Sequence, residues 1–136
     1  MSIQGRTRVS SRTPWERSFG YSRAVRVGNA VSISGTTATT REGGFVGEGD
    51  AYAQTRQVLD NIAWALQQAG ATLDEVTRVR VYVVREQDWR EVGRALGDVF
   101  GEVRPANTLV GTPWLIDPRM LVEIDADALI GSADGA

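Results

Sequence analysis

The sequence contains no cysteine, no histidine and no lysine, because all fifteen basic residues are arginine. These absences exclude zinc held by thiolate or imidazole, histidine-activated serine or cysteine nucleophiles, lysine Schiff bases and disulfide bonds. A P-loop is also excluded, since it requires a lysine. Any chemistry must therefore use carboxylates, arginine, hydroxyl groups, amides, backbone groups or water.

Length and charge narrow the class of protein further. The 136 residues suit one domain with a real core. The formal net charge of -2 does not indicate a basic surface for binding nucleic acid. The apolar runs are too short for a membrane span or a signal peptide. We therefore expect a cytoplasmic protein without a membrane partner. The lack of cysteine is compatible with that reducing compartment.

The two ends of the chain differ in composition from its middle. Residues 1–18 are polar, rich in arginine and short of apolar periodicity, which predicts a flexible arm anchored at most through Pro14 and Trp15. Residues 131–136 are mainly glycine, serine and alanine, which predicts a disordered tail. The single folded domain is expected over residues 19–130.

Four segments have the pattern of strands, and two of them alternate between one apolar and one polar face. Residues 24–34 predict a hairpin that turns at Gly28 and Asn29, and residues 76–84 and 107–112 predict two further strands. Residues 121–128 alternate most strictly, with apolar side chains at 122, 124, 126 and 128. The intervening residues are three carboxylates, Glu123, Asp125 and Asp127. Because aligned negative charges repel one another and lose hydration when covered, these carboxylates must either be exposed to water or contact cations and hydrogen-bond donors from other segments.

Two helices are expected between these strands. Asp50 is placed to cap the first, Gly70 to end it, and its apolar residues recur at helical spacing. Asp88 is placed to begin the second, with Glu91 at capping-box spacing and Gly101 as a stop. The order strand, strand, helix, strand, helix, strand, strand predicts an α+β fold in which both helices cover one face of a mixed sheet.

The other face of that sheet is expected to stay uncovered within one chain. It carries Arg78, Arg80 and the carboxylate row of Glu123, Asp125 and Asp127. Arginine forks match carboxylates, so this face is suited to polar, partly ionic contacts with another subunit. We therefore expect an oligomer.

Five short motifs, in order and with similar spacing, resemble the reactive-intermediate deaminase family, which is also called Rid or YjgF-like and sometimes labelled endoribonuclease L-PSP. They are residues 19–24 (FGYSRA), 33–35 (ISG), 57–62 (QVLDNI), 105–106 (PA) and 122–126 (VEIDA). The resemblance implies a chorismate-mutase-like fold, assembled as a homotrimer with small-molecule sites between subunits. It also implies hydrolysis of imines and enamines such as 2-aminoacrylate to a ketoacid and ammonia, without metal or organic cofactor.

The resemblance assigns site residues position by position. The cleft tyrosine of the family falls on Tyr21, its strand serine on Ser34 and its carboxylate on Glu123. In deaminating members an arginine follows Pro-Ala and clamps the substrate carboxylate, whereas here Asn107 stands in that place. An amide has no charge and no cationic fork, so weak handling of 2-aminoacrylate is expected. A substrate without a carboxylate, or no turnover, follows more naturally.

Each candidate residue also has a structural interpretation. Glu123 is either a general acid or base with a pKa raised by burial, or an interface ion-pair partner for Arg78 or Arg80. Ser34 has no histidine to activate it, so a hydrogen bond to ligand or backbone is its ordinary role. Tyr21 lines the cleft or packs beside a strand.

The last two candidates follow the Pro-Ala motif. Asn107 orients a ligand or a water molecule, or satisfies neighbouring backbone groups at the start of a strand. Trp114 is the best placed of the four tryptophans to cover a cleft, because it follows that strand, and packing is the expected role of the other three.

Two functional hypotheses from different classes follow. The first is a trimeric imine or enamine hydrolase in which Glu123 relays a proton while Tyr21, Ser34 and Asn107 position the substrate. The second is a non-catalytic trimer that binds a small metabolite or a partner protein in the same cleft. RNA binding is not expected, because separated arginines in an arm, with an acidic remainder and no aromatic platform, are typical of a solvated tail.

Overall fold

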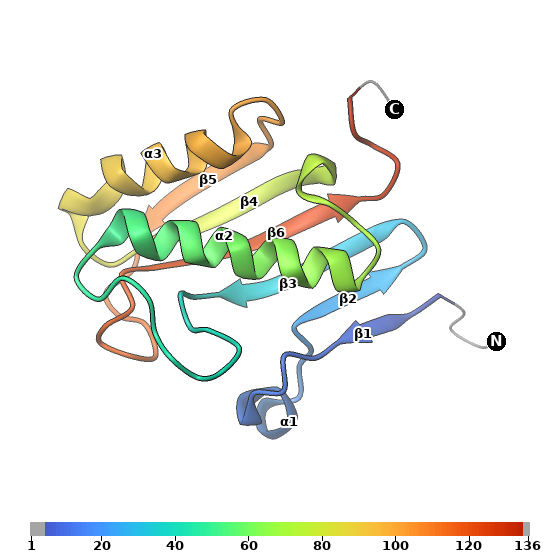
Figure 1. Cartoon of the computed structure of the whole chain (residues 1–136), viewed down its shortest axis with the longest axis horizontal. Helices are drawn as coiled ribbons and strands as arrows, with labels where there is room; N and C mark the ends of the chain where they lie inside the picture. The colour runs from blue at the N-terminus through green and yellow to red at the C-terminus, as the bar shows by residue number, and fades with distance from the viewer. Residues whose placement is uncertain (1–4, 135–136) are drawn as a thin grey trace.

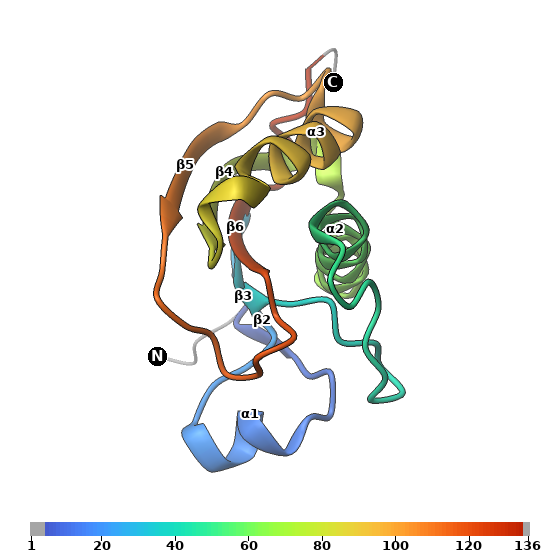
Figure 2. The ribbon, with the colours of Figure 1, turned by 90° about the vertical axis from the view of Figure 1, so that its left-hand side faces the viewer.

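The computed structural model describes residues 5–134, in which one six-stranded sheet carries two long helices on one face (Figures 1 and 2). The strand order is β1-β2-β3-β6-β4-β5; only β4 and β5 pair in parallel. The predicted α+β fold with both helices on one face of a mixed sheet is confirmed. The strands are β1 (Thr7–Val9), β2 (Ala24–Val27), β3 (Ala30–Thr36), β4 (Val76–Val83), β5 (Ala106–Gly111) and β6 (Val122–Leu129).

Strand β6 lies in the middle of the sheet, between β3 and β4. Its apolar residues at 122, 124, 126 and 128 are buried beneath the helices, while Glu123, Asp125 and Asp127 alternate with them and are only partly buried. The predicted alternation is therefore confirmed. Side chains of successive strand residues point to opposite faces, so the three carboxylates lie on the face away from the helices.

Helix α2 (Ala51–Gln68) begins and ends where the sequence predicts. The Asp50 carboxylate accepts a hydrogen bond from the amide of Ala53 at 3.0 Å and caps the N-terminus. At the other end Gly70 takes a left-handed φ of 88°, and Arg26 Nη1 donates to the carbonyl of Ala69 at 2.9 Å. A cation at a helix C-terminus is favourable, so Arg26 ties the hairpin to α2.

Helix α3 (Trp89–Phe100) begins after Asp88, but the predicted capping box is wrong. The Asp88 carboxylate makes no cap; it accepts two hydrogen bonds from the Arg85 guanidinium, at 2.7 and 3.0 Å. Glu91 likewise accepts from Arg94, at 2.8 and 3.2 Å. Charge-assisted bonds are about twice as strong as neutral ones, so the arginines take both carboxylates from the backbone amides.

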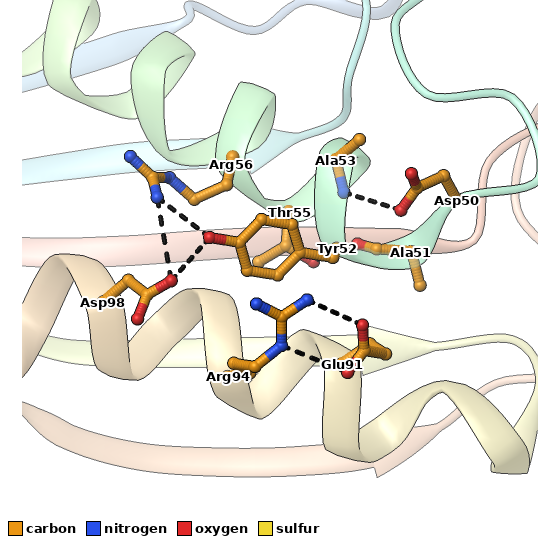
Figure 3. Close-up of polar contacts among 9 residues, drawn as sticks. All are labelled: Asp50, Ala51, Tyr52, Ala53, Thr55, Arg56, Glu91, Arg94 and Asp98. Atoms are coloured by element: carbon orange, nitrogen blue, oxygen red, sulfur yellow. Dashed lines mark hydrogen bonds and ion pairs between the residues drawn. The ribbon is translucent and has the colours of Figure 1, made fainter.

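A polar cluster joins the exposed faces of α2 and α3 (Figure 3). The Tyr52 hydroxyl donates to Asp98 at 2.5 Å and accepts from Arg56 at 3.1 Å, and Arg94 lies 3.8 Å from the centre of the Tyr52 ring. The cluster fixes the two helices relative to each other on the side of the molecule opposite the carboxylate row.

Buried Gln54 on α2 connects two loops at the end of the sheet where β6 begins. Its side-chain nitrogen donates to the carbonyls of Gly47 at 3.0 Å and Arg119 at 2.8 Å, and its oxygen accepts from the amide of Leu121 at 2.9 Å. All of its hydrogen-bonding groups are thus used, as a buried amide requires.

The segment before β2 differs from the flexible arm expected over residues 1–18. Strand β1 pairs with β2, and α1 (Pro14–Phe19) follows it. Glu16 is buried and accepts hydrogen bonds from Ser11 and Thr13, while the amide of Arg23 donates to the carbonyl of Val9 at 2.8 Å. A three-residue strand and a six-residue helix carry too little periodicity to be detected in the sequence.

The extreme ends of the chain are not described, so part of the predicted arm, residues 1–4, and part of the predicted tail, residues 135–136, lie outside the described residues. The tail residue Gly131 is tied to the domain, since its amide donates to Glu75 at 2.8 Å. Within residues 5–134 no helix has the length and apolar character needed to cross a bilayer.

Candidate functional site

Glu123 lies near the start of β6, opposite Tyr82 of β4, with its carboxyl group pressed against Gly35 of β3. A Cβ atom built at Gly35 would lie 2.6 Å from Glu123 Oε2, closer than any real contact. The register between β3 and β6 shifts between Ile33 and Thr36, which is how Gly35 comes to face the carboxyl group. Only glycine leaves room for Glu123 in this position.

Arg23, immediately before β2, supplies the positive charge beside Glu123. Its Nη2 donates to the carbonyl of Gly35 at 2.7 Å, which holds the guanidinium in this position. Its Nε is buried and has no hydrogen-bond partner within residues 5–134. Burial lowers the pKa of Arg23, and the negative charges of Glu16 and Glu123 oppose that shift.

The surroundings of Glu123 favour its neutral form. Burial raises the pKa of its carboxyl group, the positive charge of Arg23 acts in the opposite direction, and the negative charge of Asp125 raises the pKa further. The net shift is upward. A carboxyl group with a raised pKa can donate a proton nearer neutral pH and take it back, which is the property required of a general acid and base.

Two of the predicted ligand-binding residues lie close to Arg23. Tyr21 follows α1, and its amide donates to the carbonyl of Glu16 at 2.9 Å. Its partly exposed ring has its centre 5.8 Å from the Arg23 guanidinium. The Ser34 hydroxyl donates to the carbonyl of Ser22 at 2.6 Å, which is a backbone hydrogen bond of the kind expected for its structural role. Its oxygen can still accept a hydrogen bond from a ligand. Tyr21 and Ser34 line the same open depression.

The remaining two predicted residues lie elsewhere in the chain. Asn107 is exposed on the edge strand β5, beside Val79 of β4, and is separated from β3 by β4 and β6. Trp114 is 67% exposed in the loop after β5. Within one chain Tyr21 and Ser34 thus lie beside Arg23, whose charge acts on Glu123, whereas Asn107 and Trp114 lie elsewhere.

The uncovered face carries an ionic network next to Glu123. Arg80 pairs with Asp125 at 2.7 Å and with Asp127 at 3.4 Å, and the Tyr82 hydroxyl donates to Asp125 at 3.2 Å. Asp125 and Asp127 thus form the ion pairs of Arg80, and Glu123 takes no part in them. Within residues 5–134 Glu123 has no arginine at ion-pair distance, so the pairing with Arg78 or Arg80 that was its alternative role is not formed inside one chain.

Arg23 is the site residue that the sequence analysis missed. The signal was present, because Arg23 lies two residues after Tyr21 inside the FGYSRA motif. What the sequence does not reveal is that Arg23 crosses to the carbonyl of Gly35, since this contact depends on the β2–β3 pairing.

Comparisons with known proteins agree on one family. A family model described as Endoribonuclease L-PSP matches residues 14–130. A protein of Streptomyces coelicolor is 38% identical over 134 residues, which cover 98% of this chain and 99% of that protein. The 3-aminoacrylate deaminase RutC of Acinetobacter baylyi is 34% identical over 104 residues, 76% of this chain and 82% of that protein.

The solved structures give the same result at the level of the fold. The crystal structure of Rv2704 from Mycobacterium tuberculosis, described as a member of the YjgF/YER057c/UK114 family, superposes with a TM-score of 0.83. It is 46% identical in sequence, and the match covers 92% of this chain and 99% of that one.

Proposed function

The chain belongs to the Endoribonuclease L-PSP family, that of the YjgF/Rid proteins, and from this premise we propose that it is a cytoplasmic homotrimer that hydrolyses a small imine or enamine. The subunits join through the uncovered face of the sheet. Each cleft then combines Tyr21, Ser34 and Glu123 of one subunit with Asn107 and Trp114 of its neighbour. The separation of these two groups within one chain is what such a composite site requires.

The observation that carries this proposal is the environment of Glu123. Its carboxyl group is largely removed from water, lies against Gly35 and has a raised pKa, with the Arg23 guanidinium beside it. The neighbouring Asp125 and Asp127 are instead paired with Arg80, as structural carboxylates are. A carboxyl group with a shifted pKa and no arginine partner within residues 5–134 is a candidate proton carrier.

The proposed reaction uses the proton that the Glu123 carboxyl group carries. Neutral Glu123 donates its proton to the imine nitrogen, or to the terminal carbon of an enamine, which leaves an electrophilic carbon. Water adds to this carbon and returns one proton to the Glu123 carboxylate. The resulting carbinolamine expels ammonia and leaves a carbonyl compound, so each turnover consumes one water and regenerates the neutral acid. Arg23 stabilises the carboxylate form in between.

The cleft residues favour a substrate whose recognition does not depend on a carboxylate clamp. Asn107 offers an amide where deaminating members of the resembled family have arginine, and Tyr21 offers a ring and a hydroxyl group. The relative from Acinetobacter acts on 3-aminoacrylate, an enamine, and this supports the class of reaction.

The test is ammonia and carbonyl release from freshly generated 2-aminoacrylate, 3-aminoacrylate and uncharged imines. We compare the native chain, Glu123→Gln and the control Glu91→Gln, which removes an exposed carboxylate on α3. Turnover that is lost in Glu123→Gln and kept in Glu91→Gln, with the mass of a trimer in both, supports the proposal. Equal turnover by native and Glu123→Gln protein rules out the proton relay.

The alternative function is a non-catalytic trimer that binds a small metabolite or a partner protein in the same cleft. The exposed, uncharged Asn107 at the position of the substrate clamp favours it. It predicts no ammonia release with any of these substrates. It also predicts saturable binding of a ketoacid or an amino acid that is weakened by Tyr21→Ala, measured by calorimetry.

A further inference from the structure

A second groove lies where the segment before α1, a loop and the end of α2 meet. Its walls are the segment from Thr7 to Pro14, the loop 39–43 and the last turns of α2, where Trp64 contributes its side chain. Six serine and threonine side chains line it, together with Arg8, Arg12 and Arg41. The Trp64 side chain lies off the apolar stripe of α2; it packs against the core and also lines the groove.

The groove extends inward to Arg23. A smaller and more enclosed hollow shares Trp64, Arg41 and several serine and threonine residues with the groove, and Arg23 and Asn61 are among its other lining residues. Arg23 therefore borders this hollow as well as influencing Glu123. The buried Nε of Arg23 is a donor that no acceptor within residues 5–134 satisfies. A buried donor of this kind favours an acceptor supplied from outside the chain.

The charge in the groove is positive in a chain that is negative overall. Three arginines and one carboxylate, that of Glu42, line it, and a second carboxylate, that of Glu16, accepts hydrogen bonds from the lining residues Ser11 and Thr13. Over residues 5–134 no carboxylate lies at ion-pair distance from Arg12 or Arg41, whereas Arg56 and Arg94 on the helices are paired with Asp98 and Glu91. The groove arginines are therefore available to an anionic ligand.

The walls of the groove are fixed in place. The Asn61 side chain donates to the carbonyls of Thr37 at 2.9 Å and Thr39 at 2.8 Å, which holds the loop against α2. The Arg41 guanidinium lies 4.9 Å from the centre of the Trp64 ring, and this contact positions its charge over the groove. A site of this kind loses little entropy when it binds a ligand.

Arg12 shows backbone strain at the edge of the same groove. Its φ of 66° lies in the left-handed region, which a long side chain rarely adopts. Its amide donates to the Ser10 hydroxyl at 3.0 Å, which helps to hold this conformation. Strain of this kind is concentrated at functional sites.

We propose that this groove binds the phosphate group of a small metabolite, with Arg12 and Arg41 as its charged ligands and Arg23 at its inner end. Guanidinium forks match phosphate oxygens in two-point contacts. The Thr40 hydroxyl accepts from the amide of Gly44 and keeps its own proton for a remaining phosphate oxygen, whereas the hydroxyls of Ser11 and Thr13 already donate to Glu16. A carboxylate offers fewer acceptor oxygens than the donors that converge here. The site shares Arg23 with the surroundings of Glu123, but phosphate binding does not depend on the activity proposed there.

The experiment is an amide NMR titration of the full chain with inorganic phosphate, glycerol phosphate and acetate at constant ionic strength. We expect saturable shifts for both phosphates at the amides of Thr39 and Thr40 and at the Trp64 indole N–H. Arg41→Gln is expected to weaken phosphate binding by about tenfold or more, since it removes a charge-assisted bond. The same loss in Arg12→Gln identifies the second ligand independently.

Arg90→Gln is the matched control, because the Arg90 guanidinium lies 4.4 Å from the Trp89 ring on α3, far from the groove in sequence and on another element. Unchanged phosphate binding in this variant supports the proposal. Tighter binding of glycerol phosphate than of inorganic phosphate identifies a phosphorylated metabolite as the ligand, and equal binding identifies free phosphate. Shifts that do not saturate, that acetate reproduces with equal affinity, or that Arg90→Gln abolishes as fully as Arg41→Gln, overturn the proposal.

Discussion

Gly35 and Glu123 occupy adjacent strands so closely that a single methyl group on Gly35 would lie 2.6 Å from the Glu123 carboxyl oxygen. The backbone of Gly35 is not in the left-handed region, so glycine is required here for space and not for conformation. The same residue holds Arg23 through its carbonyl group. Gly35 thus determines where both charged groups of the candidate site lie.

Gly35→Ala should therefore displace the Glu123 carboxyl group without unfolding the domain. Because the obstructed atom is at the end of a flexible side chain, we expect a loss of stability of about 1 kcal/mol and a loss of ammonia release of about tenfold or more. Gly93→Ala on α3 is the control, since a Cβ there meets nothing within 4 Å. Full turnover in Gly35→Ala would show that the position of Glu123 is not critical.

The raised pKa of Glu123 makes a prediction about pH and stability. Below its ordinary value of 4.5 the carboxyl group is neutral in both folded and unfolded chains. As the pH rises from there to the higher folded pKa, the unfolded chain loses its proton first, so the free energy of unfolding decreases. Glu123→Gln abolishes this decrease, and its stability relative to the native chain should rise across that window and then level off.

Urea unfolding of native and Glu123→Gln protein from about pH 4 to pH 8 measures this difference. The protomer concentration is held constant, because assembly adds to the apparent stability. A difference in stability that is the same at every pH would mean that Glu123 titrates normally in the folded chain.

The sequence predicts the scaffold better than the site. Strict alternation in β6 and the cap at Asp50 arise from neighbours in the chain, and the structure confirms both. The capping box at Asp88 fails because Arg85 competes for its carboxylate. The contact of Arg23 with Gly35 and the space that Glu123 occupies depend on strand pairing and a local register shift, which no pattern in one segment records.

Asn107→Arg tests whether the missing charge limits activity on carboxylate substrates. Asn107 is exposed on an edge strand, so a longer side chain fits there without repacking the core. We expect KM for 2-aminoacrylate to fall by about tenfold, the effect of one added charge-assisted bond. Asn107→Gln adds length without charge and should leave KM unchanged. An equal gain in both variants would mean that size, not charge, is the limiting property.

Arg80→Glu tests the uncovered face as the surface through which subunits join. Arg80 lies between Asp125 and Asp127, at 2.7 and 3.4 Å, and its charge offsets theirs. Reversing it leaves uncompensated like charges that an approaching subunit would have to desolvate, so we expect the proposed trimer to dissociate. Light scattering coupled to size exclusion measures the mass.

Arg94→Glu is the control. It makes the same change on α3, where Arg94 pairs with Glu91, and should leave the mass unchanged. If Arg80→Glu retains the native mass while Arg94→Glu loses it, the subunits join through the helices instead, and the composite cleft at Glu123 cannot form.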